Sequence, residues 1–328
     1  MKRRQFLDYA TKATILIGSG ANSIKMMADD IKTGLVLDDD FRHHLIAPTH
    51  PESPGRYHAI KQVFTEQDII SQLTRIEPYR DIDHLLELNH TKEHIQSIKN
   101  TNLENHINAS LATGGVIAAV DQVCTGKIKN AFCASRPPGH HARNTGREEG
   151  FCYYNHVAIA ARYAQQEYNL KKILIVDWDY HHGDGTEQSF YADPDVLFFS
   201  THDYFAYPGT GDPNKKGAGA GLGLNINVHM ECGSDDADFI KAFEKKLLPA
   251  ADQFEPDLIL ISCGFDSREN DLLGCFNITN EGYKQLTKMV EGLADKHCKG
   301  KIISVLEGGY NLRGIAEAAA IHVKELMS

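Results

Sequence analysis

The chain has 328 residues, of which 42% are hydrophobic and 24% charged, and its formal net charge is −10. This length is enough to bury a sizeable core in one large domain. No uninterrupted apolar run reaches the roughly 20 residues that a membrane span needs. The negative charge argues against nucleic acid as a partner and mildly favours cationic substrates.

The first residues combine two arginines with a small apolar segment. Arg3-Arg4-Gln5-Phe6-Leu7 precedes residues 13–21, and together they are similar to a bacterial twin-arginine export signal. The alternative is a basic tail or a first helix. We expect residues 1–28 to form an extension outside a main domain of residues 29–328. Periplasmic and cytoplasmic locations both remain open.

Strand-like apolar runs alternate with helical ones along the rest of the chain. Strands are predicted at 33–37, 131–135, 172–177, 196–200, 223–228, 257–262 and 301–306, and helices at 107–124, 155–168, 235–254, 281–296 and 315–327. This alternation predicts βαβ units and hence an α/β fold: a single-domain, three-layer α/β/α sandwich with a mostly parallel central sheet. Such sheets bind ligands at the carboxyl ends of their strands.

The segment after predicted strand 172–177 carries the most informative pattern, with Asp177, Asp179, His181 and Asp184 in one short run. Because side chains alternate along a strand, we expect Asp177, Asp179 and His181 to project to one side. Asp266 follows another predicted strand. Asp179, His181 and Asp266 would leave one coordination position of a divalent metal open, as catalysis requires. Helix capping or a solvated loop is the alternative explanation.

Two further strand ends carry groups suited to acid–base chemistry. His140 and His141 follow a Pro-Pro-Gly turn, which suits two roles beside a metal-activated water: one takes its proton and the other hydrogen-bonds it. Asp177 and Asp184 are the candidates to orient them. Tyr310 follows two glycines and is placed to present its hydroxyl at the bottom of a pocket. The alternatives are a surface histidine pair and a core tyrosine.

Together these segments resemble the zinc-dependent histone deacetylase superfamily, and in particular its bacterial class II-like branch, which includes acetylpolyamine amidohydrolases. The resemblance extends from about residue 50 to 312. The motifs that carry it are Arg136-Pro-Pro-Gly-His-His-Ala142, Gly150-Phe-Cys-Tyr-Tyr-Asn155, residues 177–186, Tyr207-Pro-Gly-Thr-Gly-Asp212, Gly264-Phe-Asp266 and Glu307-Gly-Gly-Tyr-Asn-Leu312.

The resemblance implies hydrolysis of an N-acetyl amide and a role for each residue. Its metal would be Zn²⁺, or Fe²⁺, which the family can also use. The implied metal ligands are Asp179, His181 and Asp266. The implied catalytic residues are His141 as general base and then acid, Asp184 as its orienting partner, His140 backed by Asp177 as electrostatic support, and Tyr310 as oxyanion stabiliser.

The resemblance also implies a substrate tunnel and a structural cation. The tunnel would be formed by Gly150, Phe151, Tyr207 and Leu273. A structural K⁺ would sit near Asp177, Asp179, His181 and Ser200. A polyamine-selective relative carries a glutamate where this chain has Leu273, which favours acetyl-lysine, in a peptide or protein, over an acetylpolyamine or another small acetylated amine.

Other interpretations remain open at this stage. A ureohydrolase-like binuclear manganese site and a non-catalytic acyl-lysine binding module are the alternatives, and a homo-oligomer is open. Many members of the family hold the substrate backbone with a rim aspartate, and none can be placed in residues 100–108. The seven cysteines include no Cys-x-x-Cys, and we expect them to be small core residues without disulfides.

Overall fold

A computed structural model describes residues 32–328. The twin-arginine-like segment and the expected boundary near residue 28 lie outside this range. The strands are β1 (Gly34–Val36), β2 (Thr74–Arg75), β3 (Asn130–Cys133), β4 (Ile173–Asp177), β5 (Val196–His202), β6 (Asn225–His229), β7 (Leu258–Cys263) and β8 (Ile302–Leu306). They form one sheet in the order β2-β1-β3-β8-β7-β4-β5-β6, with every neighbouring pair parallel.

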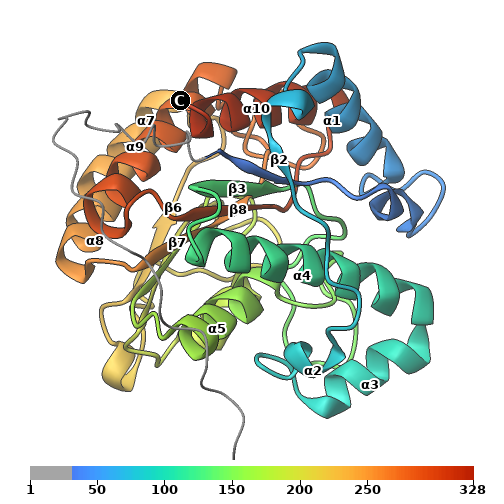
Figure 1. Cartoon of the computed structure of the whole chain (residues 1–328). Coiled ribbons are helices and arrows are strands. Elements are labelled where there is room, and N and C mark those ends of the chain that lie inside the picture. Colours follow the sequence, from blue (N-terminus) through green and yellow to red (C-terminus); the bar gives the residue numbers. More distant parts are fainter. Residues whose placement is uncertain (1–31) are drawn as a thin grey trace, which may run out of the picture. The chain divides into compact units, whose positions relative to one another are not determined.

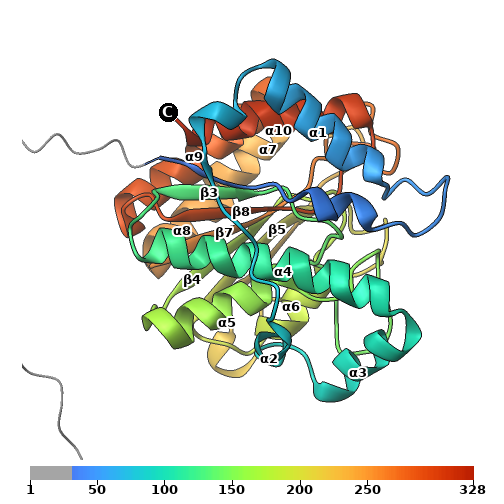
Figure 2. The same cartoon turned by 45° about the vertical axis from the view of Figure 1, so that its right-hand side comes forward.

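Helices cover both faces of the sheet (Figures 1 and 2). The α-helices are α1 (Pro54–Glu66), α2 (Asp83–Leu86), α3 (Lys92–Thr101), α4 (Leu103–Cys124), α5 (His156–Tyr168), α6 (Asp184–Phe190), α7 (Asp236–Ala242), α8 (Leu248–Phe254), α9 (Asn280–Cys298) and α10 (Leu312–Leu326). A π-helical turn at Phe243–Leu247 joins α7 to α8. The predicted three-layer α/β/α fold with a parallel sheet is confirmed.

Alternation along the buried strands explains the layers. On β4, Leu174 and Val176 pack into the core beneath α1, α9 and α10, whereas Ile173 and Ile175 pack into the core beneath α4 and α5. A strand that is buried on both faces is a nearly continuous apolar run, which is why strands such as β4 were predictable from sequence. The two cores pack against opposite faces of the sheet and hold it rigid. They thereby fix the positions of the loops at its carboxyl edge.

The structure adds elements that the sequence analysis did not predict. They include the two-residue edge strand β2, the helices α1, α2, α3 and α6, and three short 3-10 helices. Helix α4 is, among the described helices, the one long and apolar enough to cross a membrane by length and composition. Within the fold, 78% of the most apolar 18-residue stretch of this helix is buried, as expected for a core helix of a protein layer.

Candidate active site

The three predicted metal ligands converge at the carboxyl edge of the sheet. The ligand atoms of Asp179, His181 and Asp266 all lie within 4.8 Å of one another. Nδ1 of His181 lies 3.2 Å from Oδ1 of Asp179 and 3.0 Å from Oδ2 of Asp266. Both carboxylates are fully buried. No second group of three candidate ligands is found within residues 32–328.

The alternation argument for this cluster was wrong in its local detail. Strand β4 ends at Asp177, and Asp179 and His181 lie on the turn that leads into α6. Where the chain leaves the sheet, the side chain of Asp177 accepts a hydrogen bond from the backbone N–H of Asp179 at 3.1 Å. Asp177 therefore lies behind the triad, and only Asp179 and His181 reach Asp266.

Electrostatics show that the triad is suited to a cation. Burial raises the pKa of Asp266, the charge of Asp179 raises it further, and the result is about 7 despite the opposing effect of His181. Burial alone would lower the pKa of His181, but its hydrogen bonds to both carboxylates raise that pKa to about 10. Two buried carboxylates here share one histidine, His181. A divalent cation between them would neutralise their charge.

Backbone groups hold the ligand carboxylates in place. Asp179 accepts a hydrogen bond from the N–H of Gly308 at 2.8 Å, and Asp266 accepts one from Tyr180 at 3.0 Å. A Cβ atom at Gly308 would lie 2.1 Å from Oδ2 of Asp266, and one at Gly264 would lie 2.2 Å from Oδ2 of Asp179. The two glycines therefore leave the space that the ligand carboxylates occupy. The N and O donors at this point fit zinc or iron.

His140 and His141 lie side by side, with ring centroids 4.0 Å apart, but have different partners. Nδ1 of His140 lies 3.0 Å from Asp177, and Nδ1 of His141 lies 2.8 Å from Asp184. Burial lowers the pKa of His141 to about 3, and the charge of His140 contributes to this shift. Burial opposes protonation of His140, yet Asp179 and Asp177 raise its pKa well above the usual value. The two neighbouring imidazoles therefore have different carboxylate partners, and their pKa values are shifted in opposite directions.

Glu307 is a positioning residue, a role that the sequence analysis did not assign to it. It is fully buried, and its Oε2 accepts hydrogen bonds from the backbone N–H groups of Gly139 at 2.6 Å and His140 at 3.1 Å. Its Oε1 accepts a bond from Ser262 at 3.2 Å. Burial raises its pKa to about 7. An acidic residue at the end of an otherwise apolar strand was the available signal.

Tyr310 is 4% exposed and faces the cavity. Its backbone N–H donates to Oδ2 of Asp271 at 2.7 Å, and the guanidinium of Arg56 lies 5.1 Å from the centre of its ring. Arg56 is itself buried and donates to the carbonyl of Gly309 at 2.7 Å and to that of Glu307. Burial raises the pKa of Tyr310 well above its usual value, so the phenol stays protonated.

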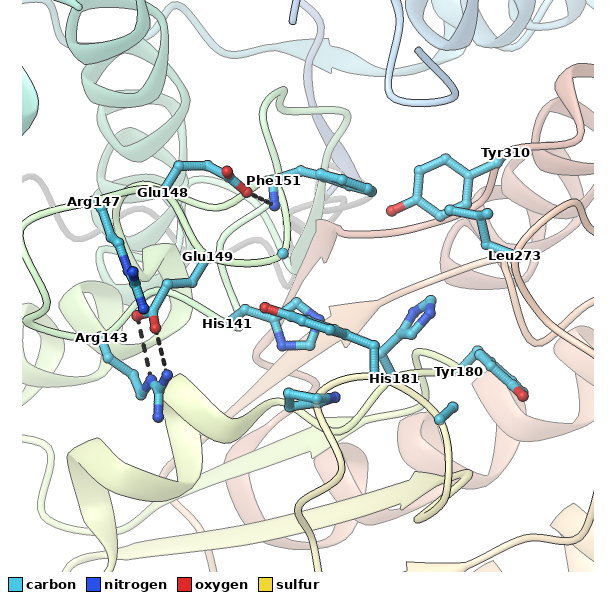
Figure 3. A pocket seen from close by; sticks show the side chains of 14 residues that line it. His141, Arg143, Arg147, Glu148, Glu149, Phe151, Tyr180, His181, Leu273 and Tyr310 are labelled. Atoms are coloured by element: carbon cyan, nitrogen blue, oxygen red, sulfur yellow. Dashed lines mark hydrogen bonds and ion pairs between the residues drawn. The ribbon is translucent and has the colours of Figure 1, made fainter. Parts of the chain in front are cut away.

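A cavity of about 900 Å³ opens in front of these groups (Figure 3). His141 and His181 are at its base, and Phe151 faces Tyr310 across it with ring centroids 6.0 Å apart. The four predicted tunnel residues, Gly150, Phe151, Tyr207 and Leu273, all line it. A Cβ at Gly150 would lie 2.3 Å from the ring of His141, so this position needs a glycine.

Ser200 lies opposite Asp177 in the register of β4 and β5, as expected for the predicted structural cation. Its hydroxyl bonds Nδ1 of His202 at 2.8 Å. Asp179 and His181 continue the chain directly beyond Asp177. The register thus pairs Ser200 with Asp177, and the K⁺ site itself stays a prediction.

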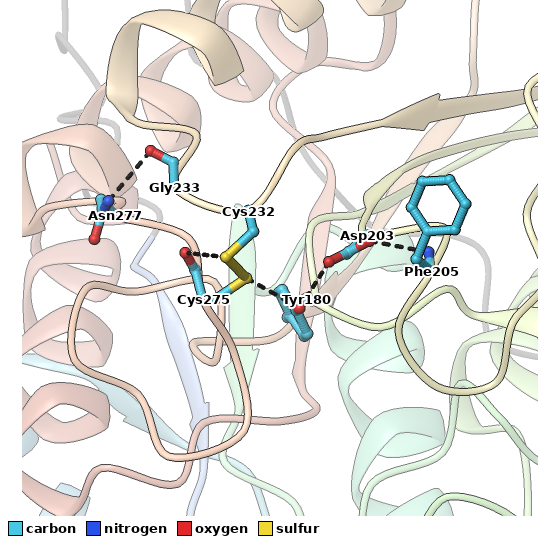
Figure 4. The surroundings of a disulfide bond; sticks show 7 residues. All are labelled: Tyr180, Asp203, Phe205, Cys232, Gly233, Cys275 and Asn277. Carbon is cyan, nitrogen blue, oxygen red and sulfur yellow. Dashed lines mark hydrogen bonds between the residues drawn. A yellow bond between two sulfur atoms is a disulfide. The ribbon is translucent and has the colours of Figure 1, made fainter.

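The expectation that no cysteine is paired was wrong for Cys232 and Cys275, which form a disulfide (Figure 4). They are 43 residues apart. The N–H of Gly233 donates to the carbonyl of Cys275 at 2.8 Å and so aligns the two loops, a long-range pairing that spacing does not reveal. Sγ of Cys275 lies 3.3 Å from the hydroxyl of Tyr180, a residue that lines the cavity. The other five cysteines are free and mostly buried.

The fold and site together define a parallel α/β protein with an Asp/His cluster that could hold a metal ion at the end of a cavity. The histone deacetylase domain matches residues 50–326, and the chain belongs to that family. It is 38% identical to histone deacetylase clr3 of Schizosaccharomyces pombe, with 90% of this chain and 48% of the relative aligned. It is 35% identical to histone deacetylase 15 of Arabidopsis thaliana (94% and 58%) and to a probable deacetylase of Archaeoglobus fulgidus (86% and 82%).

The structural comparison agrees with this assignment. The crystal structure of the HDA15 HD domain superposes with a TM-score of 0.85 at 36% identity, covering 90% of this chain and 88% of that one. The chain spans about half the length of several of the curated eukaryotic relatives that it matches. The placement in a bacterial branch stays a prediction.

Proposed function

We propose that the protein is a metal-dependent deacetylase that hydrolyses the N-acetyl amide of acetyl-lysine side chains. One observation carries the proposal: Asp179, His181 and Asp266 converge within reach of His141 and Tyr310 at the base of one cavity. A bound Zn²⁺, or Fe²⁺, would polarise the scissile carbonyl and acidify a water molecule.

His141 would act as the general base. Nδ1 of His141 forms a hydrogen bond with Asp184. The lone pair that would accept the proton of the attacking water is therefore on Nε2. The low pKa of His141 keeps the imidazole neutral at neutral pH, as a base requires. The same Nε2 would then donate the proton to the departing amine nitrogen.

His140 and Tyr310 would stabilise the charge that develops on the acyl group. The cationic form of His140, held by Asp177, provides a positive charge beside the reacting atoms. The protonated hydroxyl of Tyr310 would donate a hydrogen bond to the oxyanion. Glu307 would fix the backbone that carries both histidines.

The walls of the cavity favour a linear acyl-lysine. Phe151, Tyr207 and Leu273 offer apolar surface for the methylene stem, and Leu273 has no charge with which to attract an ammonium group. A structural K⁺ beside Ser200 and export by the twin-arginine pathway are further parts of the proposal.

The test is acetate release by the zinc-loaded protein from an acetyl-lysine peptide and from N-acetylputrescine in parallel. We expect turnover of the peptide and its loss in Tyr310→Phe, which removes the hydroxyl and keeps the ring. Preference for N-acetylputrescine would contradict the acyl-lysine assignment. Release from neither substrate would contradict the proposed activity.

A further inference from the structure

The cavity has one charged wall, formed by the segment that runs from Arg143 to Glu149. Arg143, Arg147, Glu148 and Glu149 all line the cavity, opposite the apolar side chain of Leu273 (Figure 3). The apolar groups would contact the stem of an acyl-lysine. We therefore expect the charged wall to contact the part of the substrate that lies beyond the methylene stem.

Two of the four charged side chains, those of Arg143 and Glu149, pair with each other. Arg143 makes two hydrogen bonds to the carboxylate of Glu149, one from Nε at 3.2 Å and one from a terminal nitrogen. Its Nε also lies 3.3 Å from Oδ2 of Asp184. Glu149 is 7% exposed. The Arg143 guanidinium is therefore paired with two protein carboxylates, and the buried carboxylate of Glu149 is paired with it.

The other two charges retain binding capacity. Oε1 of Glu148 accepts a hydrogen bond from the backbone N–H of Phe151, which fixes the carboxylate beside the aromatic wall (Figure 3). Its Oε2 has no hydrogen bond to any residue from 32 to 328. Within the same described range, the guanidinium of Arg147 forms no ion pair or side-chain hydrogen bond. Both side chains are exposed.

We infer that Glu148 and Arg147 bind the α-ammonium and α-carboxylate groups of an amino-acid headgroup, so that free Nε-acetyl-lysine is a preferred substrate. The inference rests on the proposed function. When the acetyl group lies at the base of the cavity, the α-carbon of the lysine remains at its mouth. A free amino acid carries one ammonium and one carboxylate on that carbon. A polyamine supplies only cations, and an internal peptide residue supplies neither charge.

The inference is tested with four substrates that differ only in their headgroup. They are free Nε-acetyl-lysine, its α-amide, its Nα-acetyl derivative and the doubly capped Nα-acetyl amide. The ratio of kcat/KM for the α-amide to that for the doubly capped compound measures the contribution of the ammonium group. The corresponding ratio for the Nα-acetyl acid measures the contribution of the carboxylate.

Glu148→Gln and Arg147→Gln are the test variants. The amide oxygen of the new glutamine can still accept the hydrogen bond from Phe151, so the turn is retained while the charge is lost. We expect Glu148→Gln to lower the ammonium ratio by about threefold to fivefold, and Arg147→Gln to lower the carboxylate ratio by a similar factor. Arg75→Gln and Glu77→Gln, which remove the same charges from an exposed ion pair outside the cavity, serve as matched controls.

The outcomes are distinguishable. A selective loss of one ratio in each variant supports the inference. Equal kcat/KM values for all four substrates in the wild type, or equal losses of both ratios in either variant or in the controls, would overturn it while leaving the deacetylase proposal intact. Absence of turnover of every substrate, the doubly capped one included, would contradict the proposed function and with it this inference.

Discussion

Gly150 lies where a single methyl group would test the geometry of the site. Its φ is +53°, and a Cβ there would lie 2.3 Å from Cδ2 of His141 and 2.9 Å from Cε1 of Tyr207. Ordinary van der Waals contact begins at 3.4 Å, so the ring of His141 would have to move by about 1 Å. That displacement would also strain its 2.8 Å bond to Asp184.

We therefore expect Gly150→Ala to lower kcat for acetate release by about 100-fold, since a 1 Å misplacement of a catalytic group has an effect of that order. An alanine at positive φ also costs about 1–2 kcal/mol of folding free energy. That loss corresponds to a decrease in Tm of about 2–4 °C per kcal/mol, which thermal unfolding would detect.

Gly126→Ala provides the matched control. Gly126 has a φ of +72°, and nothing lies within 4 Å of the position its Cβ would take. It should show a similar loss of stability with unchanged kcat. If Gly150→Ala retained activity within about threefold of the wild type, the assignment of His141 as the base at the end of this cavity would be refuted.

Three further predictions follow from the described contacts. Asp184→Asn should lower kcat by about 10- to 100-fold with little effect on KM, because it removes the charge that orients His141. Replacing Cys232 and Cys275 by serine should lower the free energy of unfolding by up to about 4 kcal/mol, measured in urea. Burial raises the pKa of Glu291 to about 7, so the folded protein holds a proton that the unfolded chain releases from about pH 4.5. Stability should fall as pH rises through this window by at most about 3 kcal/mol, and Glu291→Gln should remove that loss.

Each of these has a direct check. Unchanged kcat in Asp184→Asn would show that His141 does not depend on this carboxylate. A reductant that destabilised the serine variant as much as the wild type would show that the disulfide is not responsible for the difference. A pH profile of unfolding that is the same in Glu291→Gln and wild type would contradict the assigned ionisation.

The sheet could be predicted because its strands are buried on both faces. Runs such as Ile173–Asp177 and Leu258–Cys263 are apolar except near their carboxyl ends, where Asp177 and Ser262 lie. This pattern was sufficient to predict that Asp179, Asp266 and Tyr310 meet at one edge. Helix α1 was missed because its sequence interleaves polar and apolar residues without a clear stripe.

The unpredicted parts of the site depend on contacts between distant segments. Glu307 binds the backbone of Gly139 and His140, and Cys232 meets Cys275 only because the loops after β6 and β7 lie side by side. Nothing in the local sequence of either partner specifies the other. The same holds for Arg143, whose bonds to Glu149 leave Glu148 as the available carboxylate at the mouth.

The central claim is that Asp179, His181 and Asp266 hold the metal that catalysis requires. The most direct test is to strip the full chain with a chelator and to follow acetate release from an acetyl-lysine peptide while Zn²⁺ is added back. We predict that activity is absent without metal, rises to a plateau at about one equivalent per chain, and is not restored in Asp266→Asn. Acetate release that persists in the stripped protein, or full recovery in Asp266→Asn, would contradict the account.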